Sequence, residues 1–269
     1  MRPKALVLLA PGTNRDRDLL EALELAGGEG AILPLAELSA RKGTFADFGL
    51  LVVPGGFSYG DALGAGSLLA LDLRKRFAGE VAAFAASGRP VLGICNGFQA
   101  LVKAGLLPGA DFQEPERTVT LTANEGGRFE CRWVELVTAP SPSLWTEGLE
   151  EGLSCPVAHG EGRVAVLSPA VAERLRASGR IVLRYAGAGG RPAGGSWPAN
   201  PNGSLDDIAG LCNAEGNVLG LMPHPENALR DRQVAGLPGR RSAGALRLFV
   251  NGLGGCGSGR GLGRRGKEN

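Results

Sequence analysis

The stretch Pro-Val-Leu-Gly-Ile-Cys-Asn-Gly-Phe-Gln, residues 90–99, decides how the rest of the chain is interpreted. Its apolar run 91–94 predicts a short buried strand that stops at Cys95. The next apolar side chains, Phe98, Leu101 and Val102, are spaced to share one face of a helix. A strand that turns sharply into a helix can present the residue at the turn as a nucleophile.

Two glycines flank this cysteine. Gly93 and Gly97 make a G-x-C-x-G pattern, the sulfur counterpart of the G-x-S-x-G elbow. Small residues are needed there because strand and helix approach closely and the nucleophile's backbone is strained. The N-terminus of the helix would lie beside Cys95, and its partial positive charge favours a thiolate. The alternative is a buried cysteine at a strand end without any chemistry.

The composition is that of an ordinary soluble protein. The 269 residues are 43% hydrophobic and 21% charged, and the net charge of +2 argues against a nucleic-acid partner. The five cysteines form no C-x-x-C pair and no zinc spacing, so no metal site is expected. The sequence shows no signal peptide and no apolar stretch of the roughly 20 residues that span a membrane. We therefore expect a reduced, cytoplasmic protein.

Buried strands and helices alternate in the first hundred residues. Strands are predicted at 5–10, 31–35, 48–53 and 90–95, and helices at 18–25 and across 62–87, with a possible break at Gly79. Continuously apolar strands favour an α/β fold with a mostly parallel sheet covered on both faces. Ligands of such sheets bind beyond the carboxyl ends of the strands. The turn 54–56 and Cys95 both lie at such ends and can meet in one crevice.

The second half is less regular. Strands are predicted at 118–122, 128–137, 164–167 and 181–185, helices at 170–177 and 242–250, and a hairpin from 208–212 and 217–222. Residues 186–204 form a loop rich in Gly, Pro and Asn, which is either functional or disordered. Hydrophobic periodicity ends at Gly252. We therefore expect one domain over 1–251 and a disordered Gly/Arg-rich tail over 252–269.

A cysteine nucleophile usually needs a base, and the base needs a group that orients it. The chain has two histidines, His159 and His224. His224 is the better base because Pro225 disfavours helix at His224, and an extended chain would place Glu226 on the same side as the imidazole. The alternative is an exposed Pro-rich turn.

An acyl-transfer site also needs N–H donors for the developing oxyanion. The backbone N–H of Asn96, directly after the nucleophile, is one candidate. Gly56 is the other, because glycine lets the backbone approach a substrate closely. Taken alone, residues 54–56 would be interpreted as a turn without a catalytic role.

These motifs together resemble the class I glutamine amidotransferases, and more narrowly the glutaminase subunits of phosphoribosylformylglycinamidine synthase, over roughly residues 4–228. The resemblance also rests on the segments 54–61, 127–130, 156–162, 200–204 and 207–210. It implies the flavodoxin-like fold of that family, a mostly parallel sheet flanked by helices with additional β-hairpins. The chain departs from the family pattern at Gly126, usually Ser, at Asn227, usually Arg, and after about Ala228.

By this resemblance Cys95 attacks the side-chain amide of glutamine. His224 protonates the leaving ammonia and later activates the water that cleaves the glutamyl thioester, while Glu226 orients His224. The backbone N–H groups of Gly56 and Asn96 would form the oxyanion hole.

The resemblance also assigns residues to the substrate. The positions that match glutamine-binding positions of the family are Gly55, Phe57, Gln99 and Asn124. His159 lies in a family motif as well, and a structural or interface role is expected for it because His224 already fills the base position.

The implied partner is a separate synthetase subunit, which uses ATP and Mg²⁺ to convert formylglycinamide ribonucleotide to formylglycinamidine ribonucleotide in purine biosynthesis. A small third subunit is also expected, and no cofactor is expected in this chain. Two alternatives stay open: a scaffold subunit of the same complex that has lost turnover, and an unrelated cysteine hydrolase of the same fold.

Overall fold

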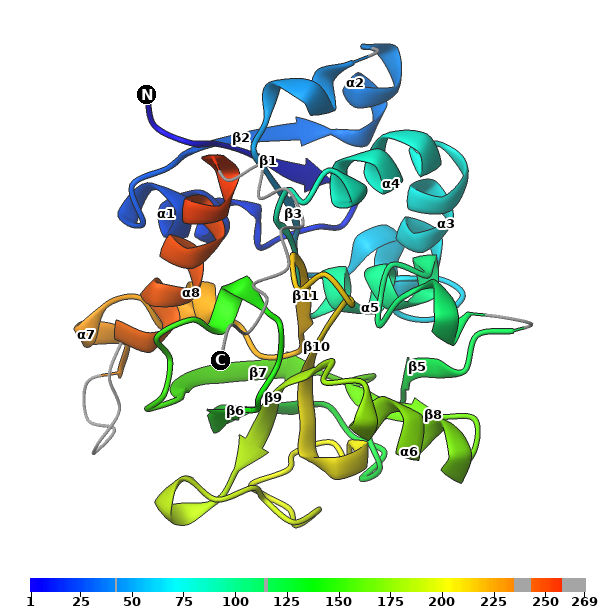
Figure 1. The fold of residues 1–269 in the computed structure, drawn as a ribbon, viewed down its shortest axis with the longest axis vertical. Coiled ribbons are helices and arrows are strands. Elements are labelled where there is room, and N and C mark those ends of the chain that lie inside the picture. Colours follow the sequence, from blue (N-terminus) through cyan, green and yellow to red (C-terminus); the bar gives the residue numbers. More distant parts are fainter. Residues whose placement is uncertain (42, 114–115, 235–242, 258–269) are drawn as a thin grey trace, which may run out of the picture.

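A nine-stranded mixed sheet runs through the molecule (Figure 1). The computed structural model describes residues 1–41, 43–113, 116–234 and 243–257. In spatial order the strands are β2 (Glu29–Pro34), β1 (Lys4–Leu9), β3 (Leu50–Val53), β4 (Val91–Ile94), β11 (Val218–Leu221), β10 (Ile208–Cys212), β9 (Ile181–Ala186), β6 (Glu130–Thr138) and β7 (Leu153–His159).

The first five strands of this order are parallel to one another. Strands β3, β4 and β11 are buried along their whole length, which explains their continuously apolar sequences. From β11 outward the pairing is antiparallel, first in the β10–β11 hairpin and last in the β6–β7 pair. The expected α/β fold with a parallel core and additional β-hairpins is confirmed.

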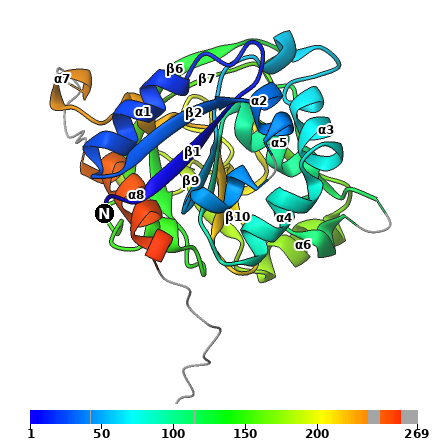
Figure 2. The ribbon, with the colours of Figure 1, turned by 90° about the horizontal axis from the view of Figure 1, so that it is seen from above.

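Helices cover both faces of the sheet (Figure 2). Helices α1 (Asp16–Leu25) and α8 (Ala243–Gly254) pack together on one face, and α3 (Ser67–Lys75), α4 (Ala78–Ala86) and α5 (Asn96–Ala104) cover the other. The remaining helices are α2 (Leu35–Ala40), α6 (Pro169–Ala177) and α7 (Asp231–Val234). None of the helices in the described ranges is long and apolar enough to cross a membrane.

A second sheet consists of two antiparallel strands, β5 (Val119–Thr122) and β8 (Arg163–Val166). Strand β5 packs on α5, the helix that begins after the cysteine elbow. The segment between β7 and β8 is therefore held close to the start of α5.

The helices of the first half differ from the prediction at two places. The interruption between α3 and α4 falls at Arg76 and Phe77, whereas Gly79 lies inside the first turn of α4. Phe77 is buried at 2% exposure, so the chain bends there to place an aromatic ring in the core rather than because a glycine breaks the helix. Helix α2 was not expected from the sequence.

The predicted boundary between residues 251 and 252 is wrong. Helix α8 continues to Gly254, and a 3₁₀ turn follows over Gly255–Gly257. Leu253 is buried, and a Cβ on Gly252 would lie 2.2 Å from the ring of Trp145. The glycines that suggested disorder therefore allow this helix to pack closely against an aromatic side chain. The rest of the predicted tail, 258–269, lies outside the described residues.

Candidate active site

Cys95 occupies the tight turn between β4 and α5. Its φ of 51° and ψ of −106° are unfavourable for any residue with a side chain, as expected of a nucleophile elbow. Two backbone hydrogen bonds hold it, from the Cys95 N–H to the Leu221 carbonyl (2.8 Å) and from the Gln99 N–H to the Cys95 carbonyl (3.0 Å). The cysteine is buried at 5% exposure and immediately precedes the nine-residue helix α5. The predicted sharp turn from strand to helix at Cys95 is confirmed.

The flanking glycines are required by contact distances. A Cβ on Gly97 would lie 1.9 Å from the carbonyl oxygen of Val53, the last residue of β3. A Cβ on Gly93 would lie 2.9 Å from backbone atoms of Gly97. Both distances are shorter than any real Cβ contact, so no side chain fits at either position.

The predicted base and its orienting acid are paired. The Nδ1 of His224 donates to Oε1 of Glu226 at 2.6 Å, and both residues are buried. The chain is not extended throughout, because Pro225–Asn227 form a 3₁₀ turn, although His224 itself has a φ of −107° and a ψ of 82°. The His224 N–H also donates to the Pro156 carbonyl (2.8 Å), which fixes the turn against β7.

The thiol and the imidazole meet over a glycine. A Cβ on Gly55 would lie 2.9 Å from Cε1 of His224 and 3.4 Å from Cβ of Cys95. The two side chains therefore occupy the space directly above Gly55, at the carboxyl ends of β3, β4 and β11. Because Nδ1 of His224 is bonded to Glu226, Nε2 is the ring nitrogen available for the reaction.

Electrostatics favour the charged form of His224. Burial by itself would lower the pKa of the imidazole, but the Glu226 carboxylate and the neighbouring Cys95 outweigh burial and raise the pKa to about 10. The histidine is therefore an imidazolium at neutral pH. An imidazolium stabilises a neighbouring thiolate and carries the proton that a leaving amine needs.

The two predicted oxyanion donors lie at neighbouring strand ends. Asn96 is the first residue of α5, where backbone N–H groups have no partner within the helix. Its side chain is held in place, since Oδ1 accepts from the Ser58 N–H (3.2 Å) and Nδ2 donates to Oδ1 of Asp61 (2.8 Å). Gly56 has a φ of +123°, and a Cβ there would meet Asn14 at 2.8 Å. Only glycine therefore fits this position.

The four predicted glutamine-binding residues lie in different surroundings. Gly55 lies at the centre of the site, and Phe57 is 46% exposed beside it. Gln99 and Asn124 are buried, and their side-chain amides bond to the protein: Gln99 Nε2 donates to the Glu161 carbonyl (2.6 Å), and Asn124 Nδ2 donates to the His159 carbonyl (2.8 Å). In this structure both amides hold the segment that follows β7 against the elbow.

Strand β7 is the part of the site that sequence reasoning missed. Pro156 lies in its middle, and proline argues against a central strand. The structure resolves this because β7 is the edge strand and pairs only with β6. Its end delivers the Ala158 carbonyl to within 3.7 Å of the Cys95 Sγ. Burial alternates along 155–159 in the structure, but Cys155 to Ala158 are all apolar, so no period-two pattern in the sequence marked this strand.

His159, the last residue of β7, is a buried neutral histidine. Its Nδ1 lies 3.2 Å from Oδ1 of Asn124, whose Nδ2 donates to the His159 and Arg128 carbonyls. Asn124 Oδ1 can only accept, so Nδ1 of His159 carries the hydrogen. Burial, reinforced by the positive charge of His224, lowers the pKa of His159 to about 4.

This histidine makes the fold sensitive to acid. Because its pKa is about 4 in the folded state and near 6.5 in the unfolded state, the unfolded chain binds the extra proton between these values. The destabilisation is absent above pH 6.5 and complete below pH 4. The variant His159→Asn keeps a donor near the position of Nδ1 but has no titrating imidazole there. Between pH 7 and pH 4.5 we expect its free energy of unfolding to decrease by less than that of the wild type, the difference between the two decreases being about 2–3 kcal/mol. Urea unfolding at both pH values measures this, and equal losses would contradict it.

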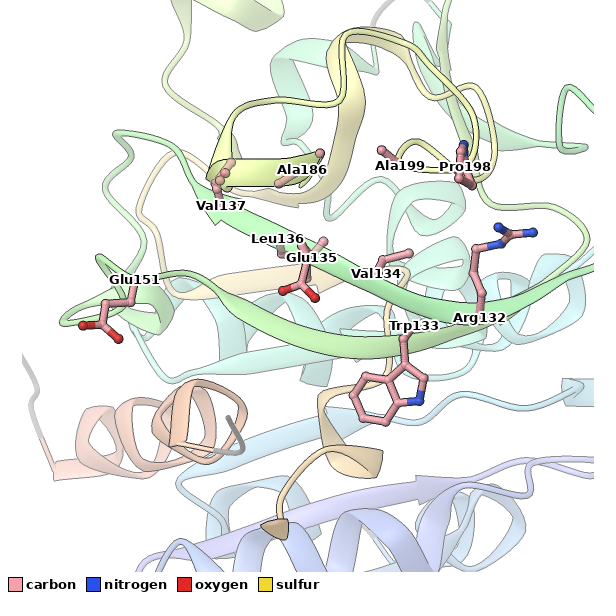
Figure 3. A pocket seen from close by; sticks show the side chains of 13 residues that line it. Arg132, Trp133, Val134, Glu135, Leu136, Val137, Glu151, Ala186, Pro198 and Ala199 are labelled. Atoms are coloured by element: carbon pink, nitrogen blue, oxygen red, sulfur yellow. The ribbon is translucent and has the colours of Figure 1, made fainter. Parts of the chain in front are cut away.

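A cavity of about 560 Å³ lies away from this site, along β6 (Figure 3). Its lining includes Arg132 and Glu135 of β6, Glu151, and the end of β9 with the three glycines after it, Gly187, Gly189 and Gly190. Arg132 and Trp133 leave the strand in opposite directions. None of the candidate catalytic residues lines this cavity, so it is not part of the candidate active site.

Comparisons with known proteins agree with this geometry. Residues 2–254 match the family model of the CobB/CobQ-like glutamine amidotransferase domain. The chain is similar to the phosphoribosylformylglycinamidine synthase subunit PurQ of Treponema denticola, with 51% identity over 86% of this chain and 91% of the relative. It is also 42% identical to that of Dehalococcoides mccartyi, over 92% of this chain and 95% of the relative.

A comparison with solved structures agrees with the sequence comparison. A chain in the solved structure of PurLQS from Thermotoga maritima superposes with a TM-score of 0.70 at 33% identity, covering 93% of this chain and 98% of that chain. The family match spans nearly all described residues, and the relatives agree over most of their length. The chain therefore belongs to the CobB/CobQ-like glutamine amidotransferase family, and within it to the PurQ subunits of phosphoribosylformylglycinamidine synthase.

Proposed function

We propose that this chain hydrolyses L-glutamine to glutamate and ammonia and supplies the ammonia to a synthetase subunit in the cytoplasm. The observation that carries the proposal is the convergence of Cys95 and His224 over Gly55, with Glu226 bonded to the far side of the imidazole. This is the arrangement of nucleophile, base and orienting acid that acyl transfer uses.

In the first half of the reaction, the Cys95 thiolate attacks the carboxamide carbon of glutamine. The N–H groups of Asn96 and Gly56 stabilise the oxyanion of the tetrahedral intermediate. His224 then donates its Nε2 proton to the departing nitrogen, ammonia leaves, and a glutamyl thioester remains on Cys95. Glu226 keeps the Nδ1 hydrogen in place throughout.

In the second half, the now neutral His224 takes a proton from water, and the resulting hydroxide attacks the thioester carbon. The same N–H donors hold the second oxyanion. Glutamate leaves, and the thiolate and imidazolium of the resting enzyme are restored. The substrate would lie along the backbone of Gly55 and beside Phe57, with Gln99 and Asn124 shaping the opposite wall.

The partner carries the rest of the chemistry. In this proposal the synthetase uses ATP and Mg²⁺ to exchange the carbonyl oxygen of formylglycinamide ribonucleotide for the delivered nitrogen, a small third subunit completes the complex, and this chain needs no cofactor of its own. The two single-residue departures from the family pattern, at Gly126 and Asn227, lie outside the triad. Gly126 is exposed, and the side chain of Asn227 donates to Asp18 on α1 at 2.9 Å. Neither departure favours an inactive scaffold.

Glutamate release by the purified chain tests the proposal. It should be measured alone and then with the synthetase subunit, its ribonucleotide and ATP–Mg²⁺. We expect glutamate in both cases and a higher rate with the loaded partner. A folded chain that releases none under either condition would establish the scaffold alternative, and hydrolysis of esters but not glutamine would establish an unrelated hydrolase.

For Glu226→Gln we expect kcat to fall by about 10²- to 10⁴-fold with little change in KM, because the amide no longer enforces the imidazole tautomer or its charge. Because the pKa of His224 is raised in the folded state, protonation of His224 also contributes to the stability of the fold. This contribution is complete below about pH 6.5 and is lost above about pH 10. The stability difference from wild type should therefore shrink as the pH rises through this range. Glu80→Gln, on the exposed face of α4, is the matched control, and an equal rate loss there would contradict the assignment.

A further inference from the structure

The loop between β3 and α3, residues 57–66, is strained. Three residues with side chains, Tyr59, Asp61 and Leu63, have φ values of 56°, 53° and 63°. This left-handed conformation is costly for any residue other than glycine and persists only where the surroundings impose it. Leu63 is the extreme case because its large apolar side chain is 85% exposed. No intramolecular burial offsets its cost.

Leu63 lies beside a hollow of about 520 Å³ on the surface formed by α3, α5 and β5. Leu71, half exposed on α3, lies along the same hollow. Three cationic side chains line it as well, and among the described residues Glu161 is the one acid in the lining. We define the Leu63 patch as Leu63, Leu71, Arg74, Lys103 and Arg117. Its apolar centre and basic surroundings complement an apolar surface flanked by carboxylates.

The loop is bonded at both ends to the residues around the nucleophile. Near its start, Ser58 and Asp61 bond the side chain of Asn96, the residue after Cys95. Near its end, the Ala65 N–H donates to Oε2 of Glu161 at 3.2 Å, and the carbonyl of Glu161 accepts from Gln99 on α5. A displacement of Leu63 is therefore transmitted to the start of α5, where the candidate oxyanion donor lies.

We propose that the Leu63 patch is the docking surface for the synthetase subunit, which presents an apolar surface flanked by acidic side chains, and that docking adjusts Asn96 through this loop. The inference rests on the proposed function, because it assigns a surface to that partner. The loop follows β3 at the same sheet edge as Cys95, so a partner docked there lies next to the source of ammonia. Contact with the partner supplies the burial that Leu63 lacks in the isolated chain.

Two substitutions of Leu63 separate docking from folding. Leu63→Gly removes the side chain and accepts the left-handed backbone, so the thermal midpoint should not fall. Leu63→Asp places a charge at the centre of the patch. Leu25→Asp, on an exposed leucine at the end of α1, is the matched control. Each full-length variant is titrated with purified synthetase loaded with its ribonucleotide and ATP–Mg²⁺.

For both Leu63 variants we expect the Kd for the synthetase to rise by at least about tenfold, and the stimulation of glutamate release to be lost at wild-type saturating concentrations. Basal release by the isolated chain should be unchanged. The double variant Arg74→Glu, Arg117→Glu should weaken binding and flatten its salt dependence. Leu25→Asp should bind like the wild type.

Wild-type Kd values in both Leu63 variants and in the double arginine variant would overturn the proposal. So would a change in self-association of the chain without a change in synthetase binding, since the occupant would then be a second copy. The Kd does not depend on glutamine turnover. A wild-type chain that binds the synthetase through this patch but releases no glutamate would therefore refute the proposed function and leave the docking surface standing.

Discussion

Replacing Cys95 by alanine is expected to reduce glutamate release by at least about 10⁴-fold. Without the thiolate no glutamyl thioester can form, and His224 and the oxyanion donors have no covalent intermediate to act on. The substitution removes one sulfur atom and leaves the strained backbone as it is, so the fold should persist. Binding of the synthetase should also persist, because the Leu63 patch is unaltered.

The measurement is single-turnover and steady-state glutamate formation, with circular dichroism to verify folding. Cys131→Ala is the matched control, because Cys131 is an exposed free cysteine on β6. That variant should retain wild-type activity. A Cys95→Ala variant that still forms glutamate at a tenth of the wild-type rate would show that the nucleophile is another residue.

Gly97→Ala is expected to destabilise the fold by about 3 kcal/mol or more, enough to leave much of a marginally stable protein unfolded. The added Cβ would lie 1.9 Å from the carbonyl oxygen of Val53. Both atoms belong to backbone or are attached directly to it, so no flexible side chain can move aside. The start of α5 would have to shift away from β3, and Asn96 would move with it.

Gly79→Ala provides the matched control in α4. Nothing lies within 4 Å of its added Cβ, and the helical backbone favours alanine over glycine. This variant should be more stable by about 0.5–1 kcal/mol. Urea unfolding of both variants compares the two positions. A Gly97→Ala protein as stable as the wild type would show that the elbow is looser than these contacts imply.

Much of the site could be predicted because its signals are local. The elbow depends on a few consecutive residues: an apolar strand, a cysteine between small residues, and an amphipathic helix. The pairing of His224 with Glu226 is likewise a contact between residues two apart. Glu226 nevertheless reaches the imidazole from a 3₁₀ turn, and not from the extended chain that Pro225 predicts.

Other features depend on contacts between distant segments. Strand β7 is tolerated with Pro156 in its middle only because it is the edge of the sheet, and no local pattern reveals an edge. In the sequence, the glycines of α8 resemble those of a disordered tail. Their role is visible only in the structure, where Gly252 packs against Trp145, a residue over a hundred positions away. The hydrogen bonds that tie Asn124 to the end of β7 are equally non-local.

The sequence by itself determined the α/β class, the strand–turn–helix at Cys95 and the pairing of His224 with Glu226, because each follows from periodicity or from residues that are neighbours in the chain. Only the tertiary structure decided that Cys95 and His224, 129 positions apart, meet over Gly55. It also placed the strained Leu63 in solvent while its loop holds Asn96. These relations arise from how β3, β4, β11 and β7 pack, and packing of distant segments leaves no short-range pattern in a single sequence.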